Sequence, residues 1–218
     1  MNGGDWGSGM GDGGRLRQAL RLIVILDDGA AAGRDLAELA AAAVTGGATM
    51  LQVRAKQTPP GPLAEITRRV VAASPGVPVI VNDRLDVALA AGAAGCHLGQ
   101  HDFPLADARA MVPAGFILGG SAGSAGEARR ASQGGAHYLG VGPIHGTGNK
   151  SDAGAAIGAD GFATVRAATT LPCVAIGGVT AADVPQLLAA GAAGVAVIGA
   201  VLNAPDVEAA ARTIAREL

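Results

Sequence analysis

The chain has few aromatic side chains and little charge. Aromatic residues make up 2% of its 218 residues and charged residues 16%, whereas 50% are hydrophobic. A core built from this composition must be filled by aliphatic side chains. The net charge of −2 provides no electrostatic attraction for nucleic acid or for an anionic membrane surface. We therefore expect one globular domain with no nucleic acid or membrane partner.

Long apolar runs and a signal sequence are also missing. No uninterrupted apolar run reaches the roughly 18 residues that a membrane-spanning helix needs. Residues 1–14 are rich in glycine and contain no apolar run, so they do not read as a signal peptide. We predict a disordered leader over residues 1–14, one domain over residues 15–218, and a cytoplasmic protein. The two cysteines, Cys96 and Cys173, lie in separate apolar stretches and are expected to be buried, reduced thiols.

What the chain has is a regular alternation of short apolar stretches and alanine-rich segments. The pattern predicts strands at residues 22–26, 49–56, 77–82, 95–99, 116–119, 138–141, 174–176 and 195–198. It predicts helices at residues 35–44, 62–73, 85–91, 105–111, 125–133, 161–168, 181–190 and 207–218. Eight strand–helix units in about 200 residues are typical of a single-domain α/β (β/α)8 TIM barrel.

A repeated glycine supports the barrel. Gly47, Gly92, Gly135 and Gly191 each precede an alanine at the predicted end of a helix, just before every second strand. Glycine favours the left-handed conformation that ends many helices. A doubly wound open sheet is the alternative, but it would not explain this repeat. The first strand is also not followed by the G-x-G-x-x-G turn that is typical of dinucleotide-binding sheets.

The stretch from Thr49 to Lys56 is the most informative. On a strand, Gln52, Arg54 and Lys56 share one face, and the apolar residues between them share the other. Because a buried charge needs a partner, such a row indicates either a solvated edge strand or a site that binds an anion.

Other polar residues follow the predicted strands, at the end of a TIM barrel where active sites form. They are Asn82, Asp83, Gln100, Asp102 and Ser121. Carboxylates beside Lys and Arg indicate a site for Mg²⁺ and a diphosphate. Asp83 could instead cap the helix that starts at Leu85. Gly177, Gly178 and Gly199 follow the last two strands, where backbone N–H groups of TIM barrels bind phosphate, although each could be a plain tight turn.

The segment from Gly142 to Gly154 is long for a connection between a strand and a helix. It is rich in glycine and carries Thr147, Asn149 and Lys150, so we expect a lid that closes over an anion. The histidines give weaker signals. His97 reads as a hydrogen-bonded core residue rather than a catalyst, His137 as a solvated residue, and none of the four has metal-ligand spacing.

Together these motifs resemble the thiamine phosphate synthase family over roughly residues 20–215. The matching motifs are Q-x-R-x-K at residues 52–56, V-N-D at 81–83, H-L-G-Q-x-D at 97–102, G-x-S-A at 119–122, G-P-I-x-x-T-x-x-K at 142–150 and A-I-G-G-[IV] at 175–179. The resemblance implies a TIM barrel that joins hydroxymethylpyrimidine diphosphate to thiazole phosphate and releases diphosphate.

The resemblance also implies roles for particular residues. It implies that the diphosphate is held by Gln52, Arg54, Lys56, Asn82, Ser121 and Lys150, with Ser121 and Lys150 in catalytic roles. It implies Mg²⁺ as cofactor on Asp83 and Asp102. It implies that the thiazole phosphate is held by Thr147, Gly178, Ile198 and Gly199, with Asn149 beside them.

Three positions depart from the family pattern. Gly123 stands where the family usually has His, Asn149 where it often has a hydroxyl residue, and Gly199 where it often has Ser. Two other functions therefore stay open: a related thiazole tautomerase, and a non-catalytic barrel that binds thiamine phosphate. Both aspartates favour the synthase, since neither alternative needs Mg²⁺. The sequence leaves the oligomeric state open, a homo-oligomer included.

Overall fold

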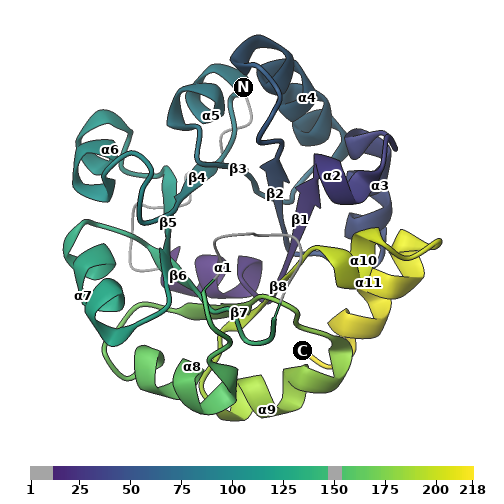
Figure 1. Cartoon of the computed structure of the whole chain (residues 1–218). Coiled ribbons are helices and arrows are strands. Elements are labelled where there is room, and N and C mark those ends of the chain that lie inside the picture. Colours follow the sequence, from purple (N-terminus) through teal and green to yellow (C-terminus); the bar gives the residue numbers. More distant parts are fainter. Residues whose placement is uncertain (1–11, 147–153) are drawn as a thin grey trace.

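The protein is a closed ring of eight parallel strands enclosed by helices (Figure 1). A computed structural model describes residues 12–146 and 154–218. Each strand pairs with its neighbours in sequence, and β8 pairs with β1 to close the ring. The strands are β1 Leu22–Asp27, β2 Met50–Arg54, β3 Val79–Asn82, β4 Gly95–Leu98, β5 Ile117–Ala122, β6 Tyr138–Val141, β7 Cys173–Ile176 and β8 Gly194–Val197. This closure confirms the predicted TIM barrel and excludes the open sheet.

The predicted helices are present, with ends that differ by a few residues. They are α3 Leu36–Thr45, α4 Pro60–Ala73, α5 Leu85–Ala91, α6 Leu105–Met111, α7 Ala125–Gln133, α8 Gly158–Arg166, α9 Val184–Ala189 and α11 Val207–Ala215. The predicted helix at residues 181–190 begins as a short 3-10 turn, η1 Ala181–Asp183, before α9.

Three further helices were not predicted. They are α1 Asp12–Ala19, α2 Asp28–Ala31 and α10 Gly199–Leu202. Two of them span only four residues, too few to show a helical period. Helix α1 begins with the residues D-G-G. Because glycine disfavours a helix, its start could not be recognised in the sequence. Residues 12–14 therefore belong to a helix and not to a leader, whereas residues 1–11 lie outside the described residues.

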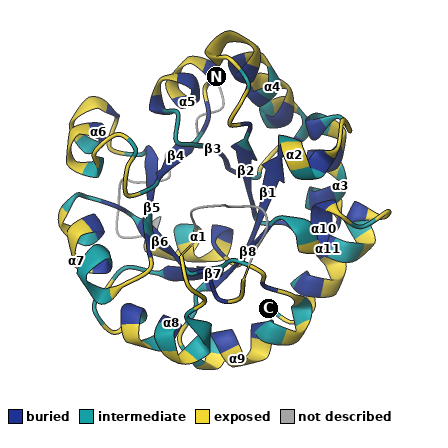
Figure 2. Cartoon of the chain, viewed as in Figure 1, coloured by how far each residue is buried: buried dark blue, intermediate teal, exposed yellow. Residues whose placement is uncertain are grey.

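The strands are buried on both faces (Figure 2), and the two faces belong to different clusters. Ile23, Ile25 and Met50 pack inside the barrel, whereas Leu51 and Val53 pack outside it, against the helices. Side chains alternate along a strand, so the inward row of β2 continues from Met50 to Gln52 and Arg54. The predicted shared face of Gln52 and Arg54 is therefore the inner face of the barrel.

Helix α1 closes the amino-terminal mouth and is seen inside the ring of strands in Figure 1. Its last residue, Ala19, and the following Leu20 belong to the inner cluster. The Thr49 hydroxyl, just before β2, donates to the Ala19 carbonyl over 2.9 Å and accepts from the Leu22 N–H over 2.8 Å. These bonds fix the end of α1 to the start of two strands, so α1 is part of the barrel core.

The predicted repeat of helix-ending glycines is confirmed. Gly47, Gly92, Gly135 and Gly191 have φ angles of 106°, 69°, 85° and 90°, all in the left-handed region. None of the helices within residues 12–146 and 154–218 combines the length and the apolar character that a membrane crossing requires.

Replacement of Leu20 by Ala tests whether α1 and its following residue close the barrel. Leu20 is fully buried in the inner cluster, so Leu20→Ala should lower the free energy of unfolding by about 2–4 kcal/mol. The exposed Arg17→Ala should change it by less than about 0.5 kcal/mol. Chemical denaturation measures both, and equal stabilities of Leu20→Ala and wild type would contradict the packing described.

Candidate active site

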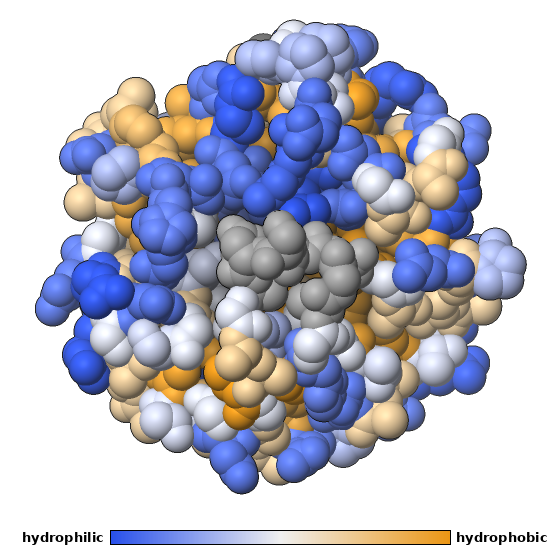
Figure 3. All heavy atoms as spheres, in the orientation of Figure 1, coloured by the Kyte–Doolittle hydropathy of each residue, from blue (hydrophilic) through white to orange (hydrophobic). Residues whose placement is uncertain are grey.

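A cavity of about 800 Å³ opens at the carboxyl ends of the strands. Hydrophilic residues gather over the loops that follow β2 to β4, in the upper half of Figure 3. The cavity brings together ten of the thirteen residues to which the family resemblance gives a role: Gln52, Arg54, Lys56, Asn82, Asp83, Asp102, Ser121, Gly178, Ile198 and Gly199. The other three, Thr147, Asn149 and Lys150, lie outside the described residues, as does the centre of the expected lid.

Strand β2 delivers the cationic side of the cavity. Gln52 is only 4% exposed, with Arg54 next along the same inward row. Arg54 donates through Nη1 to Asp27 at the end of β1. Lys56 follows the strand, is 44% exposed, and lies 3.9 Å from an oxygen of Asp83. The solvated-edge interpretation of this strand is therefore wrong: both neighbours of β2 are in place, and the row faces the interior.

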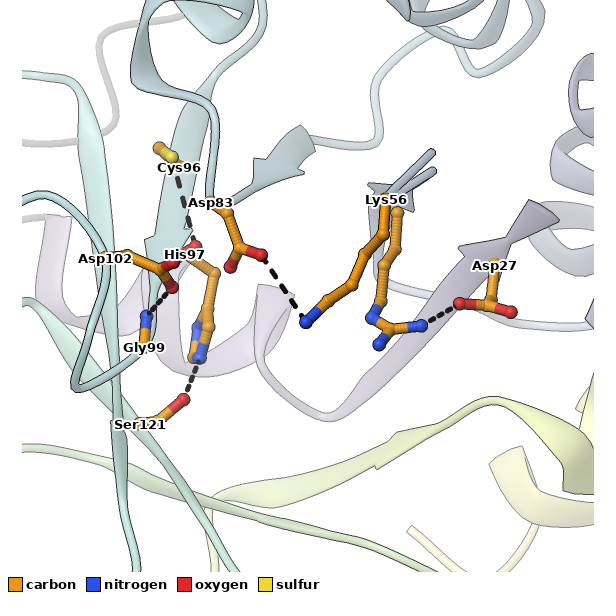
Figure 4. Close-up of polar contacts among 9 residues, drawn as sticks. Asp27, Lys56, Asp83, Cys96, His97, Gly99, Asp102 and Ser121 are labelled. Carbon is orange, nitrogen blue, oxygen red and sulfur yellow. Dashed lines mark hydrogen bonds and ion pairs between the residues drawn. The ribbon is translucent and has the colours of Figure 1, made fainter. Parts of the chain in front are cut away.

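Two carboxylates face each other across the loops after β3 and β4. Asp83 follows β3, and its N–H donates to the His97 carbonyl over 2.8 Å. Asp102 accepts from the Gly99 N–H over 2.7 Å, which turns it toward Asp83 (Figure 4). Burial and, after it, the neighbouring Asp102 raise the pKa of Asp83, while Lys56 and Arg54 lower it; together these effects bring the pKa to about 6.

Asp83 also has an unusual backbone. Its φ of 62° lies in the left-handed region, which few residues other than glycine adopt. The N-cap position of α5 is Arg84, and no side chain caps that helix. The alternative role of Asp83 as a helix cap is therefore wrong, and its side chain is left to the cavity.

A column of hydrogen bonds runs from the barrel interior to the cavity. His97 Nδ1 lies 2.9 Å from the Tyr138 hydroxyl, and Nε2 lies 3.0 Å from Ser121 Oγ (Figure 4). Tyr138 is buried in the inner cluster, and burial raises its pKa, so its hydroxyl keeps its proton. When that hydroxyl donates to Nδ1, Nε2 donates to Ser121 and leaves the serine proton for a ligand. His97 is thus the hydrogen-bonded inner residue that we predicted, and it orients Ser121.

The glycines after β7 allow another loop to approach closely. Gly177 and Gly178 have φ angles of 94° and 67°, and a Cβ on them would lie 2.6 Å from Pro143 and 2.9 Å from His145. The His145 N–H donates to the Gly177 carbonyl, and His145 Nε2 lies 2.9 Å from Asp183 Oδ1. The segment after β6 is therefore held against the segment after β7 at the edge of the cavity.

Other predictions concern residues away from the chemistry. Cys96 and Cys173 are free and buried, as predicted, and burial raises the pKa of both thiols, to about 11 for Cys173. Neither is a thiolate nucleophile at neutral pH. The prediction of a solvated His137 is wrong, because its Nδ1 accepts from the Leu118 N–H and burial lowers its pKa.

Sequence reasoning missed three residues. Asp27 ends an apolar strand, and its pairing with Arg54 depends on the register between β1 and β2. Tyr138 reads as core, and only the fold brings it to His97. Glu127 accepts from the Gly123 N–H over 2.6 Å and lines the cavity. The S-x-x-E spacing from Ser124 to Glu127 is a helix-start signal that could have drawn attention to Glu127.

The comparisons with known proteins agree with this geometry. Residues 22–201 match the family model described as thiamine monophosphate synthase. The chain belongs to the thiamine monophosphate synthase family. The thiamine-phosphate synthase of Methanoculleus marisnigri is 48% identical over 88% of this chain and 92% of the relative, and that of Moorella thermoacetica is 47% identical over 88% and 93%.

A solved structure of a thiamine phosphate pyrophosphorylase from Pyrococcus furiosus also resembles this chain. Its TM-score is 0.85 at 35% identity, over 93% of this chain and 96% of that one. Membership of the thiamine monophosphate synthase family therefore rests on sequence and on fold together.

The raised pKa of Asp83 gives a pH prediction for the metal-free protein. The pKa of Asp83 is near 6 in the folded protein and near 3.9 in the unfolded chain, so the folded protein binds the proton more tightly. The contribution of Asp83 to the free energy of unfolding is therefore full at low pH and is lost as pH rises through about 6. The free energy of unfolding should thus fall between pH 5 and 7 by on the order of 1–2 kcal/mol from this group.

Carboxyl-detected NMR of the protein in excess chelator would follow the titration of the Asp83 side chain directly. In Asp102→Asn the titration midpoint of Asp83 should move down but stay above the usual value for an aspartate, because burial is the larger cause of its raised pKa. The exposed Asp107→Asn is the control and should not move it. An Asp83 midpoint near 4 in the wild type would contradict the arrangement.

Proposed function

We propose that the protein is a thiamine-phosphate synthase that joins hydroxymethylpyrimidine diphosphate to thiazole phosphate and releases diphosphate. The observation that supports this most is the cavity itself. Residues from separate strands, matching the motifs of the family, line one opening at the carboxyl ends of the barrel strands. The substrates are small molecules, in keeping with a cavity of about 800 Å³.

We assign the two substrates to opposite sides of the cavity. The β2 to β5 side, with its cations, would bind the diphosphate through Gln52, Arg54, Lys56, Asn82 and Ser121, joined by Lys150. The β7 and β8 side, with its glycines, would bind the thiazole phosphate through Gly178, Ile198 and Gly199, joined by Thr147 and Asn149. Thr147, Asn149 and Lys150 are assigned on the family motif alone.

The donor set fits Mg²⁺. Asp83 and Asp102 are hard oxygen ligands that repel each other, and this repulsion adds to burial in raising the pKa of Asp83. Mg²⁺ typically takes one or two protein carboxylates and completes its shell with water and substrate phosphate, and Asp83 and Asp102 could supply those carboxylates. When bound there, Mg²⁺ would neutralise negative charge on the diphosphate oxygens.

The remaining chemistry needs positioning rather than a nucleophile. When the Tyr138 hydroxyl donates to His97 Nδ1, Nε2 carries a proton and cannot accept one from Ser121, so His97 does not activate this serine as a nucleophile. Loss of diphosphate from an aminopyrimidine leaves a stabilised cation. Arg54, Lys56 and Ser121 would hold the departing diphosphate, and the glycines opposite would aim the thiazole nitrogen at the cationic carbon.

Two of the departures from the family pattern leave the proposal intact. A Cβ on Gly123 would contact only the Gly142 carbonyl at 3.3 Å and Glu127 at 3.6 Å. The absence of the family's histidine at this position therefore leaves open space in the cavity. Gly199 still offers a backbone N–H at the start of α10. Asn149 lies outside the described residues.

An assay with both substrates tests the function. Diphosphate release that requires both substrates, with thiamine phosphate detected by mass spectrometry, is the expected result. Binding of thiamine phosphate without turnover would indicate the non-catalytic barrel instead. Isomerisation of a thiazole carboxylate without diphosphate chemistry would indicate the tautomerase.

The metal assignment gives a second prediction. Asp102→Ala should lower kcat by about 10²-fold or more, because a clamp on developing charge is lost. Mg²⁺ should also raise the melting temperature of the ligand-free wild type, since it relieves the repulsion between Asp83 and Asp102, and should not raise that of Asp102→Ala. The exposed Asp107→Ala is the matched control. Full activity in excess chelator would contradict this assignment.

A further inference from the structure

Asp27 is a buried carboxylate to which nothing above gives a role in the reaction. It ends β1, and its side chain is 7% exposed. In the register between β1 and β2, Asp27 lies opposite Arg54, as Ile25 lies opposite Gln52. Partners in a parallel ladder point to the same face, so Asp27 and Arg54 extend the two inward rows to the carboxyl end.

Both oxygens of Asp27 have fixed partners. Oδ1 accepts from the Ala30 N–H over 2.9 Å and caps α2, and Oδ2 accepts from Arg54 Nη1. The carboxylate is thus held by the first turn of α2 on one side and holds the guanidinium on the other. A helix N-terminus stabilises the negative charge that this pair requires.

The pair consists of a residue that lines the cavity and a residue that supports it. Of the described residues that line the cavity, Arg54 is one and Asp27 is not. Within residues 12–146 and 154–218, the Arg54 side chain makes no hydrogen bond other than the one to Asp27. A guanidinium has five N–H donors in a planar fork, so the remaining donors stay available to an oxyanion in the cavity.

We propose that Asp27 is a positioning residue: it holds the Arg54 guanidinium in place through Nη1, so that the remaining N–H groups meet the substrate diphosphate. Without this anchor, Arg54 would have to be ordered when the ligand binds, and affinity would fall. The inference rests on the proposed function, which places the diphosphate beside Arg54.

A competing effect works in the opposite direction. Asp27 also cancels part of the Arg54 charge and would then weaken anion binding. The geometry favours positioning, because Asp27 lies behind Arg54 and contributes no oxygen to the cavity. The sign of the change in affinity therefore distinguishes the two effects.

The test uses Asp27→Asn, which keeps an oxygen for the Ala30 N–H and removes the charge. The matched control is Asp35→Asn, since Asp35 also caps a helix and pairs with an arginine, Arg69, but lies outside the cavity lining. Calorimetry measures the binding of inorganic diphosphate in the presence of Mg²⁺. We expect Asp27→Asn to weaken it about tenfold, and Asp35→Asn to leave it within about twofold.

A double-mutant cycle with Arg54→Ala shows whether Asp27 acts through Arg54. In the Arg54→Ala background, Asp27→Asn should change diphosphate affinity by less than about twofold, which a purely structural role would not predict. Steady-state kinetics should show a raised KM for the pyrimidine diphosphate, with the KM for thiazole phosphate unchanged. If Asp27→Asn does not fold, Asp27→Ser keeps a cap oxygen and serves in the same cycle.

Three results would overturn the inference: unchanged diphosphate affinity in Asp27→Asn, tighter binding, or an equal loss with and without Arg54. The proposed function is judged separately, by diphosphate release from both substrates with the wild type. If that release fails, the synthase assignment fails, and the calorimetric cycle still decides whether Asp27 positions Arg54.

Discussion

The cost of burying charge organises the inside of this barrel. Its inward rows begin with aliphatic residues such as Ile23 and Met50, and they end with Asp27 and Arg54 at the carboxyl mouth. A charge placed lower would be far from water and from ligands, and would need a partner of its own. The rows therefore change character along their length, and the change marks the boundary between core and site.

Much of the fold could be predicted because its signals are local. Apolar runs, alanine-rich helices and the glycines at 47, 92, 135 and 191 each depend on a few neighbouring residues. Helix α1 could not, because its stability comes from packing Ala19 and Leu20 into the barrel rather than from its own glycine-rich start. Tertiary packing of this kind leaves no periodic pattern in a single short segment.

The same distinction between local signals and tertiary packing applies to the residues of the site. The row of Gln52, Arg54 and Lys56 and the aspartates at 83 and 102 could be found from strand spacing and from their place after strands. The pairing of Asp27 with Arg54, and of Tyr138 with His97, could not, because each joins residues from different strands whose register is set by the closed barrel. The residues that touch a ligand leave a trace in local sequence, whereas those that hold them in place do not.

The left-handed backbone at Asp83 has a consequence for engineering. A glycine at that position would relieve the strain, on the order of 1 kcal/mol, and would also remove a carboxylate that is costly to bury. A screen for heat resistance alone would therefore favour the loss of this aspartate. Its left-handed backbone and its buried carboxylate present an oxygen ligand to the cavity, but both destabilise the protein when no ligand is bound. Thermostabilised libraries of this chain would need a second selection, on turnover, to keep position 83 acidic.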